Sequence, residues 1–532
     1  MPGSRGLFTA LLILLVWLPI PLGSNHPWSW ALMEVWVYLI AAVWLLKYAR
    51  GRVTLTEPFR QARPALILFA LWLGYGLLQM VPLPGSVVAA ISPNTAALYQ
   101  QAQLGPLLAN QDLVPNPVAR PLPSFTDATT PGDRPATDAD TQAINIDPQA
   151  PEPDLSSADA PNPAAVADTV AIPADILSAA LANSYSARLT LDLSASLTAW
   201  LKSLAYVLLF VLTLLLVDST QRLKTLGYVL VLSGLGQAVY GSLALAVAGG
   251  GNASGTFINR NHFAAYLVLC LAVGIGLLIA SMGRSASAGS WRDRLRRIGA
   301  LVLSAKAPLR IFLAIMVIAL VLTHSRMGNT SFFASLLITA TLALFLFKDM
   351  PRPVMLLIAS LIVIDIFIIG SWVGLEKVRD RIAETTLAGE SRDEFGLHSF
   401  RMWQDYPLFG AGAGSFYGVF PRYREVEAER GFLEHAHNDY LELLSEYGIL
   451  GILFPAGIVI LALRNAILAQ HKRRSQFARG IGFAATMAIT AMLIHATVEF
   501  NLQIPAYAAT FMVILAMAWL SRYLRSGNRP DS

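Results

Sequence analysis

Apolar blocks long enough to cross a lipid bilayer recur along this chain, and they limit its possible folds more than any other feature. Most blocks have roughly 17–24 residues, which as a helix spans the hydrocarbon core of a membrane, and two short ones, 310–323 and 449–463, need residues from their flanks to do so. With 55% apolar and only 14% charged residues, a chain of 532 residues has too little polar surface to be soluble. We therefore expect an all-α polytopic membrane protein with about twelve transmembrane helices, near 7–23, 29–46, 64–82, 196–217, 225–248, 263–282, 310–323, 331–347, 354–374, 449–463, 481–498 and 504–520.

The positions of the 39 lysines and arginines predict the orientation of these helices. Most of them fall in alternate short connections, and basic residues in short loops mark the cytoplasmic side of a membrane. Both termini are then cytoplasmic, and two long segments, 84–195 and 375–448, lie outside. The basic runs at 292–297 and 472–474 fit this role in orientation and a contact with anionic lipid. We therefore expect membrane lipids as partners, and no nucleic acid.

This orientation divides the chain into five parts. They are helices 1–3 in 1–83, a first outside segment in 84–195, helices 4–9 in 196–374, a second outside segment in 375–448, and helices 10–12 with a tail in 449–532. Within the first outside segment, residues 115–175 are largely Pro, Ala, Asp, Thr and Ser. Such a composition cannot bury enough apolar area to offset chain entropy, so we expect a disordered acidic linker there.

Two short polar segments interrupt the apolar pattern, each beside a predicted span. The first reads Gly-Thr-Phe-Ile-Asn-Arg-Asn-His-Phe at 255–263 and contains Arg260, Asn261 and His262. The second reads His-Ala-His-Asn-Asp-Tyr-Leu-Glu-Leu-Leu at 435–444. Polar and ionisable side chains are costly to desolvate at a membrane boundary unless they serve a site. The sequence therefore places the chemistry at these two segments.

The second polar segment also predicts how His437 is placed. Asp439 followed by Glu442 fits a capping box at the start of a short helix over 440–447. His437 and Asn438 then precede a helix N-terminus, which attracts anions and favours the neutral form of a histidine. A neutral histidine beside an anion is suited to general base catalysis. The alternative is that His437 only bonds a loop carbonyl at the membrane interface.

Three arginines on the predicted outer side are candidates for holding an anion. Arg260 lies between two spans, Arg326 lies at the outer end of another, and Arg401 begins an aromatic segment. Guanidinium groups bind phosphate oxygens bidentately and keep their charge at a lipid boundary. Several of them on one side of the membrane favour a diphosphate site over arginines that only reach the lipid headgroups.

A carboxylate and a glycine run complete the polar outer side. Glu499, at the outer end of a span, is expensive to bury unless it is paired, and an arginine is the natural partner. The run Gly-Ala-Gly-Ala-Gly at 410–414 follows no strand and has the wrong spacing for a dinucleotide-binding loop, so it predicts a flexible turn. Aromatic residues favour an ordered loop over 375–448. No carboxylate cluster faces the outside, and we expect neither a metal nor a cofactor.

At these residues the chain resembles the bacterial O-antigen ligase and polymerase family. The likeness covers about 225–515 and rests on the segment at 255–263, Ser-Arg-x-Gly at 325–328, Trp-x-Asp-x-Pro-x-x-Gly-x-Gly at 403–412, and His-Asn-x-x-Leu from His437 followed by Gly448. The resemblance implies about twelve spans in the bacterial inner membrane, with a large periplasmic loop between helices nine and ten. That loop is 375–448 here. The insertion at 115–175 departs from the usual compact loop of the family.

The resemblance also implies a reaction. Members of the family take glycan from an undecaprenyl-diphosphate carrier and transfer it to a sugar hydroxyl, on lipid A core or on a growing polysaccharide. In this chain, His437 would remove the acceptor proton in a single displacement with inversion, and arginine charge would replace a metal ion. The predicted site comprises catalytic His437 and Asn438, diphosphate-binding Arg260, Arg326 and Arg401, and supporting Asn261, His262 and Glu499.

Two other functions are compatible with such a membrane protein. A transporter of a small anion or a lipid-linked sugar would place its polar residues near the bilayer midplane, often in repeated halves. Here they gather at the outer ends of spans and no internal repeat is evident, which favours the enzyme. A structural scaffold would tolerate substitution of the arginines and histidines. The sequence does not separate ligase from polymerase.

Overall fold

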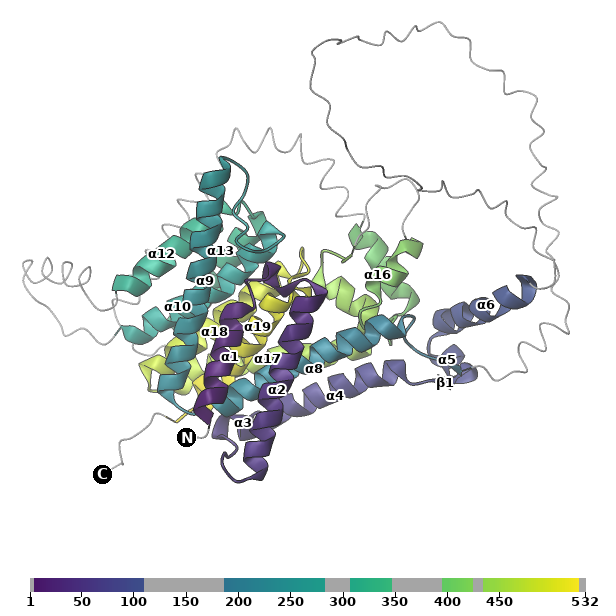
Figure 1. The fold of residues 1–532 in the computed structure, drawn as a ribbon, viewed down its shortest axis with the longest axis horizontal. Coiled ribbons are helices and arrows are strands. Elements are labelled where there is room, and N and C mark those ends of the chain that lie inside the picture. The colour runs from purple at the N-terminus through teal and green to yellow at the C-terminus, as the bar shows by residue number, and fades with distance from the viewer. Residues whose placement is uncertain (1–3, 110–185, 283–306, 347–394, 424–433, 526–532) are drawn as a thin grey trace, which may run out of the picture. The chain divides into compact units, whose positions relative to one another are not determined.

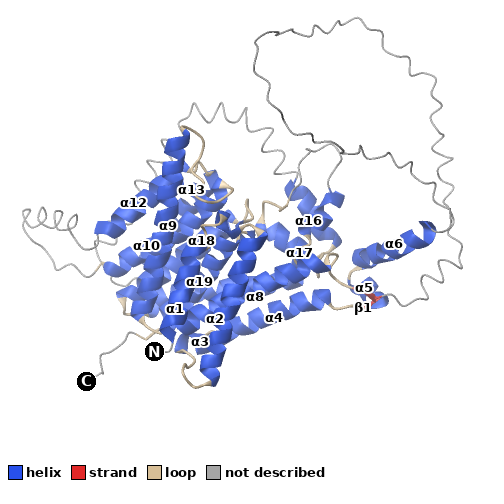
Figure 2. Ribbon diagram, in the orientation of Figure 1, coloured by secondary structure: helices blue, strands red, loops and turns tan. Residues whose placement is uncertain are grey.

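The computed structural model describes residues 4–109, 186–282, 307–346, 395–423 and 434–525 (Figure 1). These residues are almost entirely helical, and the strands among them, Leu83–Pro84 (β1) and Ser186–Ala187 (β2), have two residues each (Figure 2). The described part of the chain is therefore all-α. It belongs to two compact units, of which the first combines Met1–Ala96 with Ala187–Ser532 and the second is Ala97–Ser186.

Nine helices of the described residues are long and apolar enough to cross a membrane, so the chain is a multi-pass membrane protein. They are α2 (Pro27–Ala49), α4 (Arg63–Met80), α8 (Leu193–Leu216), α9 (Thr220–Ala248), α10 (Arg260–Ser281), α13 (Arg326–Leu346), α17 (Asp439–Lys472), α18 (Gln476–His495) and α19 (Pro505–Tyr523). Two shorter apolar helices, α1 (Arg5–Trp17) and α12 (Ala307–Leu322), match two further predicted blocks. The remaining predicted block, 354–374, lies outside the described residues.

Shorter elements connect these helices. They are α3 (Glu57–Gln61), α5 (Gly85–Ile91), α6 (Pro93–Ala109), α16 (Phe416–Val419) and the 3-10 turns η2 (Leu22–Ser24), η3 (Phe420–Tyr423) and η4 (Asn501–Gln503). The predicted linker at 115–175 lies outside the described residues. Of the predicted outside segment 375–448, the structure describes 395–423 and 434–448, and both parts pack through defined hydrogen bonds.

Three helices form the centre of the bundle: α10, α18 and α19, whose side chains are mostly buried. Membrane helices pack through small residues, because lipid tails give apolar side chains no advantage from burial. Gly276 of α10 and Gly480 of α18 meet in this way, since a Cβ atom on Gly276 would lie 2.4 Å from the Gly480 carbonyl oxygen. This contact joins the end of α10 to the start of α18, so the opposite ends of the two helices also lie together.

Helix α17 is interrupted at Gly448, where φ is 64° and ψ is −179°. The break frees backbone groups that a continuous helix would bond internally. Backbone amides of the glycine-rich segment at 410–414 donate hydrogen bonds to these free carbonyls instead. Ala411 N–H donates to the Ser445 carbonyl (2.8 Å), and Gly412 N–H donates to the Glu446 carbonyl (3.0 Å). The long helix is therefore two helices, and the site described below is carried by the first of them.

The glycine run at 410–414 is a turn, as predicted, but close packing fixes its conformation. Gly410, Gly412 and Gly414 all have positive φ angles. A Cβ atom on Gly410 would lie 2.2 Å from the Glu446 carbonyl oxygen. A side chain would meet both a strained backbone and a clash at this position. The expectation of a flexible turn is therefore wrong, because packing rather than mobility requires these glycines.

Loops from distant parts of the chain meet at one end of the bundle. The amide of Ala253 donates to the Leu322 carbonyl (3.0 Å), which joins the loop before α10 to the end of α12. The Asn438 side-chain nitrogen donates to the Thr497 carbonyl (2.9 Å), which joins the start of α17 to the loop after α18. We call this end the polar end, because the first turns of α10, α13 and α17 and the last turn of α18 lie there.

Candidate functional site

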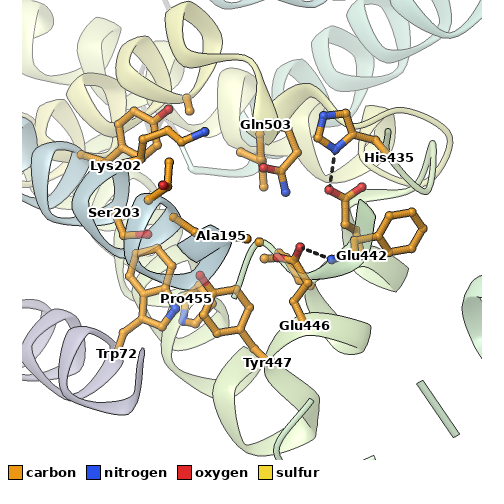
Figure 3. A pocket seen from close by; sticks show the side chains of 18 of the residues that line it. Trp72, Ala195, Lys202, Ser203, His435, Glu442, Glu446, Tyr447, Pro455 and Gln503 are labelled. Carbon is orange, nitrogen blue, oxygen red and sulfur yellow. Dashed lines mark hydrogen bonds and ion pairs between the residues drawn. The ribbon is translucent and has the colours of Figure 1, made fainter. Parts of the chain in front are cut away.

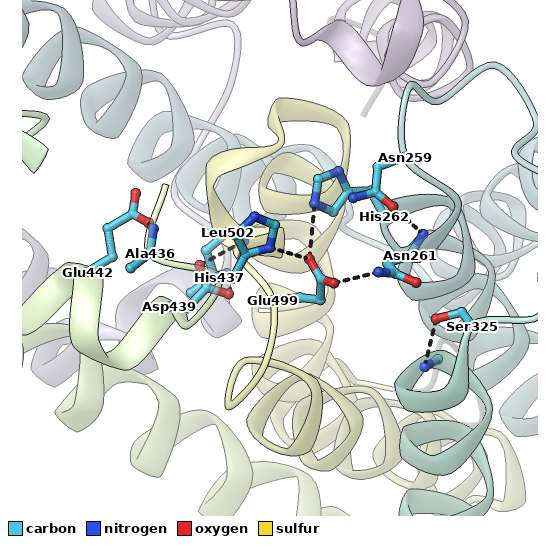
Figure 4. A network of polar contacts seen from close by, with 11 residues as sticks. Asn259, Asn261, His262, Ser325, Ala436, His437, Asp439, Glu442, Glu499 and Leu502 are labelled. Atoms are coloured by element: carbon cyan, nitrogen blue, oxygen red, sulfur yellow. Dashed lines mark hydrogen bonds and ion pairs between the residues drawn. The ribbon is translucent and has the colours of Figure 1, made fainter. Parts of the chain in front are cut away.

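A buried carboxylate lies at the centre of the polar end. The Glu499 side chain is only 1% exposed. Its carboxylate accepts a hydrogen bond from Asn261 and lies 3.8 Å from His262 Nε2 and 3.5 Å from His437 Nδ1 (Figure 4). The structure thus brings together four residues that the sequence singled out, from the start of α10, the loop before α17 and the loop after α18. These contacts place an amide and two imidazoles beside Glu499, and its expected pairing with an arginine stays a prediction.

The local sequence explains how α10 presents two of these groups. Asn259 precedes the helix, and its side-chain oxygen accepts a hydrogen bond from the amide of Asn261 (2.8 Å). Asparagine is a preferred residue at this position because its side chain satisfies an unpaired amide of the first turn. The cap fixes the direction in which α10 begins, so the side chains of Asn261 and His262 are directed toward Glu499.

His437 sits on a short connection that is held firmly to the loop after α18. Its φ angle is 49°, in the left-handed region that non-glycine residues rarely adopt. The next residue, Asn438, caps α17 by accepting hydrogen bonds from the amides of Tyr440 and Leu441. The Asp439 amide donates to the Glu499 carbonyl (3.2 Å). Every polar atom of the Asn438 side chain is used in this connection, so its geometry fits a positioning role better than the predicted catalytic one.

The capping box expected at this helix is not formed as predicted. Asn438, not Asp439, is the cap, and Asp439 is the first helical residue. Glu442 does reach back, but to the Ala436 amide (2.9 Å) and to His435 Nδ1 (2.7 Å). The Asp439 carboxylate instead accepts a hydrogen bond from the Leu502 amide, in the 3-10 turn η4 that follows Glu499. The difference moves the helix start by one residue and gives Glu442 a histidine partner that the sequence pattern did not reveal.

Phe500 holds three imidazoles in place. Its ring is stacked on that of His435, with centroids 4.4 Å apart, and meets His262 and His437 edge-on at 4.6 and 4.8 Å. Aromatic rings in such stacked and edge-on arrangements attract one another beyond the area they bury. The histidines of one helix, α10, and of the loop before α17 therefore share a single rigid support next to Glu499.

Arg260 and Arg326 begin two adjacent helices at this end. Each is the first residue of its helix, α10 or α13, and each is exposed. The helix starts are in contact, since a Cβ atom on Gly328 would lie 2.5 Å from the Ala264 Cβ. Helix N-termini carry unpaired amides and a partial positive charge, and two guanidinium groups add to this. The pair of helix starts is therefore an electropositive surface beside the Asn261 and Glu499 contact.

Arg401, the third predicted arginine, belongs to a different part of the structure. It is exposed, and its segment is attached to α17, where Ser445 Oγ donates to the Ser399 carbonyl (3.1 Å). The Asp405 carbonyl of the same segment accepts a hydrogen bond from Asn94 (3.0 Å). These contacts do not link Arg401 to the starts of α10 and α13, and its role in binding a diphosphate stays a prediction.

The pair of His435 and Glu442 forms the rim of a cavity of about 520 Å³ (Figure 3). Residues of α4, α8, α17, α18 and α19 line it, together with residues near α16. Glu446 and Lys202 also face this cavity, and the sequence had singled out neither. Lys202 could have been identified from the sequence, because it is a lone lysine inside an otherwise apolar predicted span and charged residues within a membrane are usually functional.

The neighbours of His435 raise its pKa above the ordinary value. Burial, the largest single influence, would lower this pKa, but the Glu442 carboxylate at 2.7 Å, together with Glu446 and Glu434, outweighs it. A histidine with a raised pKa in the folded state stabilises the fold below the pKa of the unfolded chain, about 6.5. This stabilisation is lost as the pH rises through the folded-state pKa.

This linkage predicts the pH dependence of one substitution. His435→Gln should lower the melting temperature of the purified protein most below about pH 6.5, because only there is the full charge interaction with Glu442 lost. The difference from wild type should shrink as the pH rises above that value. His471→Gln, an exposed histidine at the far end of α17, serves as control and should show no such trend. An equal shift for His435→Gln at every pH would contradict the assignment.

The described residues contain no group of three or more His, Cys, Asp or Glu side chains placed to hold a metal ion together. The only cysteine of the chain, Cys270, is buried in α10. The ionisable groups at the polar end are instead arranged as histidine and carboxylate contacts, beside the exposed arginines.

Residues 311–456 match a protein-family model described as O-antigen ligase. The matched stretch contains Arg326, Arg401, His437 and Glu442, whereas Arg260 and Glu499 lie on either side of it. No curated protein matches the chain. The match thus covers the second polar segment and the helices that lead into it.

Proposed function

Because this chain is a membrane protein of the O-antigen ligase family, we propose that it transfers glycan from an undecaprenyl-diphosphate carrier to a sugar hydroxyl. The observation that carries the proposal is the position of His437. Its imidazole lies beside the buried Glu499 carboxylate, next to helix starts that bear two exposed arginines. A base, a carboxylate that orients it and an anion-binding surface are the groups that such a transfer needs.

The carboxylate determines which nitrogen of His437 can act. Nδ1 faces Glu499 Oε2 at 3.5 Å, at the outer edge of hydrogen-bond distance. A carboxylate on this side favours the tautomer with its proton on Nδ1, which leaves the Nε2 lone pair to accept a proton. In the reaction, Nε2 takes the proton of the acceptor hydroxyl while the oxygen forms a bond to the anomeric carbon. The bond from that carbon to the lipid diphosphate breaks, so the configuration inverts.

Arg260 and Arg326 support the departure of the lipid diphosphate. Negative charge develops on the leaving oxygen, and guanidinium groups already in place stabilise it without reorganising. Asn261, next to Arg260, bonds Glu499, so the surface that holds the leaving group and the carboxylate that orients the base are parts of one helix start. His262 and Phe500 keep the imidazole of His437 in position.

We assign the polar end to the periplasmic side of the bacterial inner membrane, with both termini in the cytoplasm. The basic residues of the short connections support this orientation. Lipid-linked glycans and their acceptors then approach the polar end from the outer leaflet, and the acceptor is either lipid A core or another glycan.

The direct test is transfer in proteoliposomes. The purified chain should convert undecaprenyl-diphosphate glycan and an acceptor glycan into the joined product, with release of undecaprenyl diphosphate, and empty liposomes should not. Movement of the lipid-linked glycan across the bilayer without any joined product would support transport instead and reject the proposal.

We also expect the transfer to need no added divalent metal. Arginine charge neutralises the diphosphate in this mechanism, so excess EDTA should leave the initial rate within about twofold of the untreated rate, whereas loss of an essential metal costs orders of magnitude. The measurement is the rate in proteoliposomes before and after chelation. Loss of activity in EDTA that magnesium or manganese restores would overturn the metal-free mechanism.

A further inference from the structure

The cavity rimmed by His435 and Glu442 changes in character along its length. At the polar end it is lined by carboxylates, His435 and Gln503, and further along by the apolar residues Ile458, Met512 and Leu515. On α8 the lining residues continue from Ser194 to Tyr206, a distance of about 18 Å along a helix. The cavity therefore follows the helices from the polar end into the part of the bundle that lies at membrane depth.

Lys202 stands where the polar part of this cavity gives way to the apolar part. It is the single lysine or arginine among the described residues that line the cavity, and its side chain extends toward the space opposite Gln503 (Figure 3). Its ammonium group lies 4.9 Å from the centre of the Trp30 ring. The carboxylates that act on it through space are Glu34 and Glu446. None of the described carboxylates lies within ion-pair distance of it.

Three of the four carboxylates that line the cavity already have protein partners, and the fourth, Glu434, is exposed. Glu442 is bonded to His435, and Glu446 accepts a hydrogen bond from the Phe416 amide (3.3 Å). Asp192 caps α8 by accepting from the Ala195 amide (2.9 Å). Lys202 is therefore the basic group that the interior of the cavity offers to an anionic ligand. A cation without an ion pair inside a membrane-spanning helix is costly unless a ligand or a function needs it.

The groups along an anionic lipid follow the same order as the residues along the lining of the cavity. Its hydrocarbon chain fits the apolar part, its phosphate meets Lys202, and a sugar attached to the phosphate extends toward His435. The volume of about 520 Å³ is that of a site for one drug-sized ligand. It has room for a single hydrocarbon chain near the headgroup.

The cavity lies on the other side of the catalytic histidine from the two arginines. His435 and Glu442 belong to the cavity, whereas Asn261 and His262 approach Glu499 from α10, with His437 between the two groups (Figure 4). A base that joins two substrates has to be reached by both. His437 itself is not among the residues that line the cavity, but His435, two residues before it, is. The arginines and the cavity therefore offer two separate approaches to the segment that carries this histidine.

We infer that this cavity binds the lipid anchor of the acceptor, a single hydrocarbon chain with a phosphate or diphosphate group held by Lys202. The inference rests on the proposed transfer function and extends it, because it makes the acceptor a lipid-linked glycan on a single-chain carrier. The chain is then a polymerase that extends a lipid-linked glycan, rather than a ligase that modifies lipid A core.

Transfer kinetics with two acceptors test this inference. Wild-type protein should use an undecaprenyl-diphosphate-linked acceptor at a KM about tenfold lower than that of the same glycan without lipid, the ratio expected for one charge-assisted contact. Lys202→Gln should remove most of this preference and leave the KM of the glycan donor and the rate with lipid-free acceptor unchanged. Lys202→Arg should restore the preference in part. Lys224→Gln, an exposed lysine of α9, is the matched control.

Binding without turnover keeps the inference separate from the proposed function. In a His437→Ala background, undecaprenyl phosphate should bind about tenfold more tightly than undecaprenol, and Lys202→Gln should remove this difference. If the wild type transfers no glycan but shows this Lys202-dependent binding, the proposed function fails and the cavity is still a lipid phosphate site. Equal binding of the phosphate and the alcohol by the wild type, or an effect of Lys202→Gln on the donor KM alone, would overturn the inference.

Discussion

His437→Ala should reduce the rate of glycan transfer by roughly 10²-fold to 10⁴-fold, the range that a positioned general base contributes. The imidazole takes the acceptor proton in the proposed mechanism, so its removal leaves the reaction without its base. Folding should be little affected, since the side chain is 30% exposed. The measurement is the initial rate in proteoliposomes, with the amount of inserted protein determined in the same sample.

The left-handed backbone of His437 requires a second variant. Alanine is strained at a φ of 49°, whereas asparagine adopts this conformation more readily. His437→Asn should therefore be as inactive as His437→Ala while retaining the wild-type melting temperature. His324 is a matched control, because it too has a positive φ of 50° and its imidazole contacts the loop residue Asn252. His324→Asn should keep its activity. Near-normal transfer by His437→Asn would remove the residue from the mechanism.

Arg260→Lys and Arg326→Lys should each lower kcat/KM for the glycan donor by roughly 10²-fold, the lower range for loss of one preorganised charge-stabilising contact. Both changes keep the positive charge but lose the planar fork that binds two phosphate oxygens at once. Because the net charge stays the same, the lower kcat/KM would report the lost bidentate contact with the phosphate oxygens. Arg464→Lys, at an exposed position of α17, should have no effect.

The same assay decides the role of the third predicted arginine. Arg401 lies on a segment attached to α17, so Arg401→Lys is expected to change the donor kinetics less than either of the other two substitutions. A loss at Arg401 as large as at Arg260 would place the aromatic segment in the diphosphate site. Unchanged donor kinetics in both Arg260→Lys and Arg326→Lys would exclude the two helix starts as the anion site.

The helical frame could be predicted from the sequence because apolar block length is a direct consequence of bilayer thickness. The gathering of Asn261, His262, His437 and Glu499 was also within reach, since each is a polar residue at the end of a predicted span. The contacts between particular pairs of these residues could not be predicted. The contacts of Glu499 with two imidazoles and an amide could not be read from the sequence, because contact between two particular helix ends depends on helix packing such as that of Gly276.

Other parts of the site depended on tertiary contacts that a local pattern cannot contain. Glu442 satisfied a capping pattern with Asp439, yet it bonds His435, because the chain before the helix turns back at a left-handed residue. Lys202 gave one visible signal, a lysine in an apolar span. Its environment depends on α4, α17 and α19, whose positions around α8 no local pattern records.

The break at Gly448 separates two tasks within one helix. The part of α17 that follows the break is inserted among the membrane helices, whereas the part that follows His437 is hydrogen-bonded to the glycine segment at 410–414. Substitutions in the loop that contains this segment can thus shift His437, the proposed base, while the membrane scaffold stays the same. In the proposed transfer, a new sugar specificity can then arise by exchange of this one loop, and that loop is where variants with altered glycan choice should first be sought.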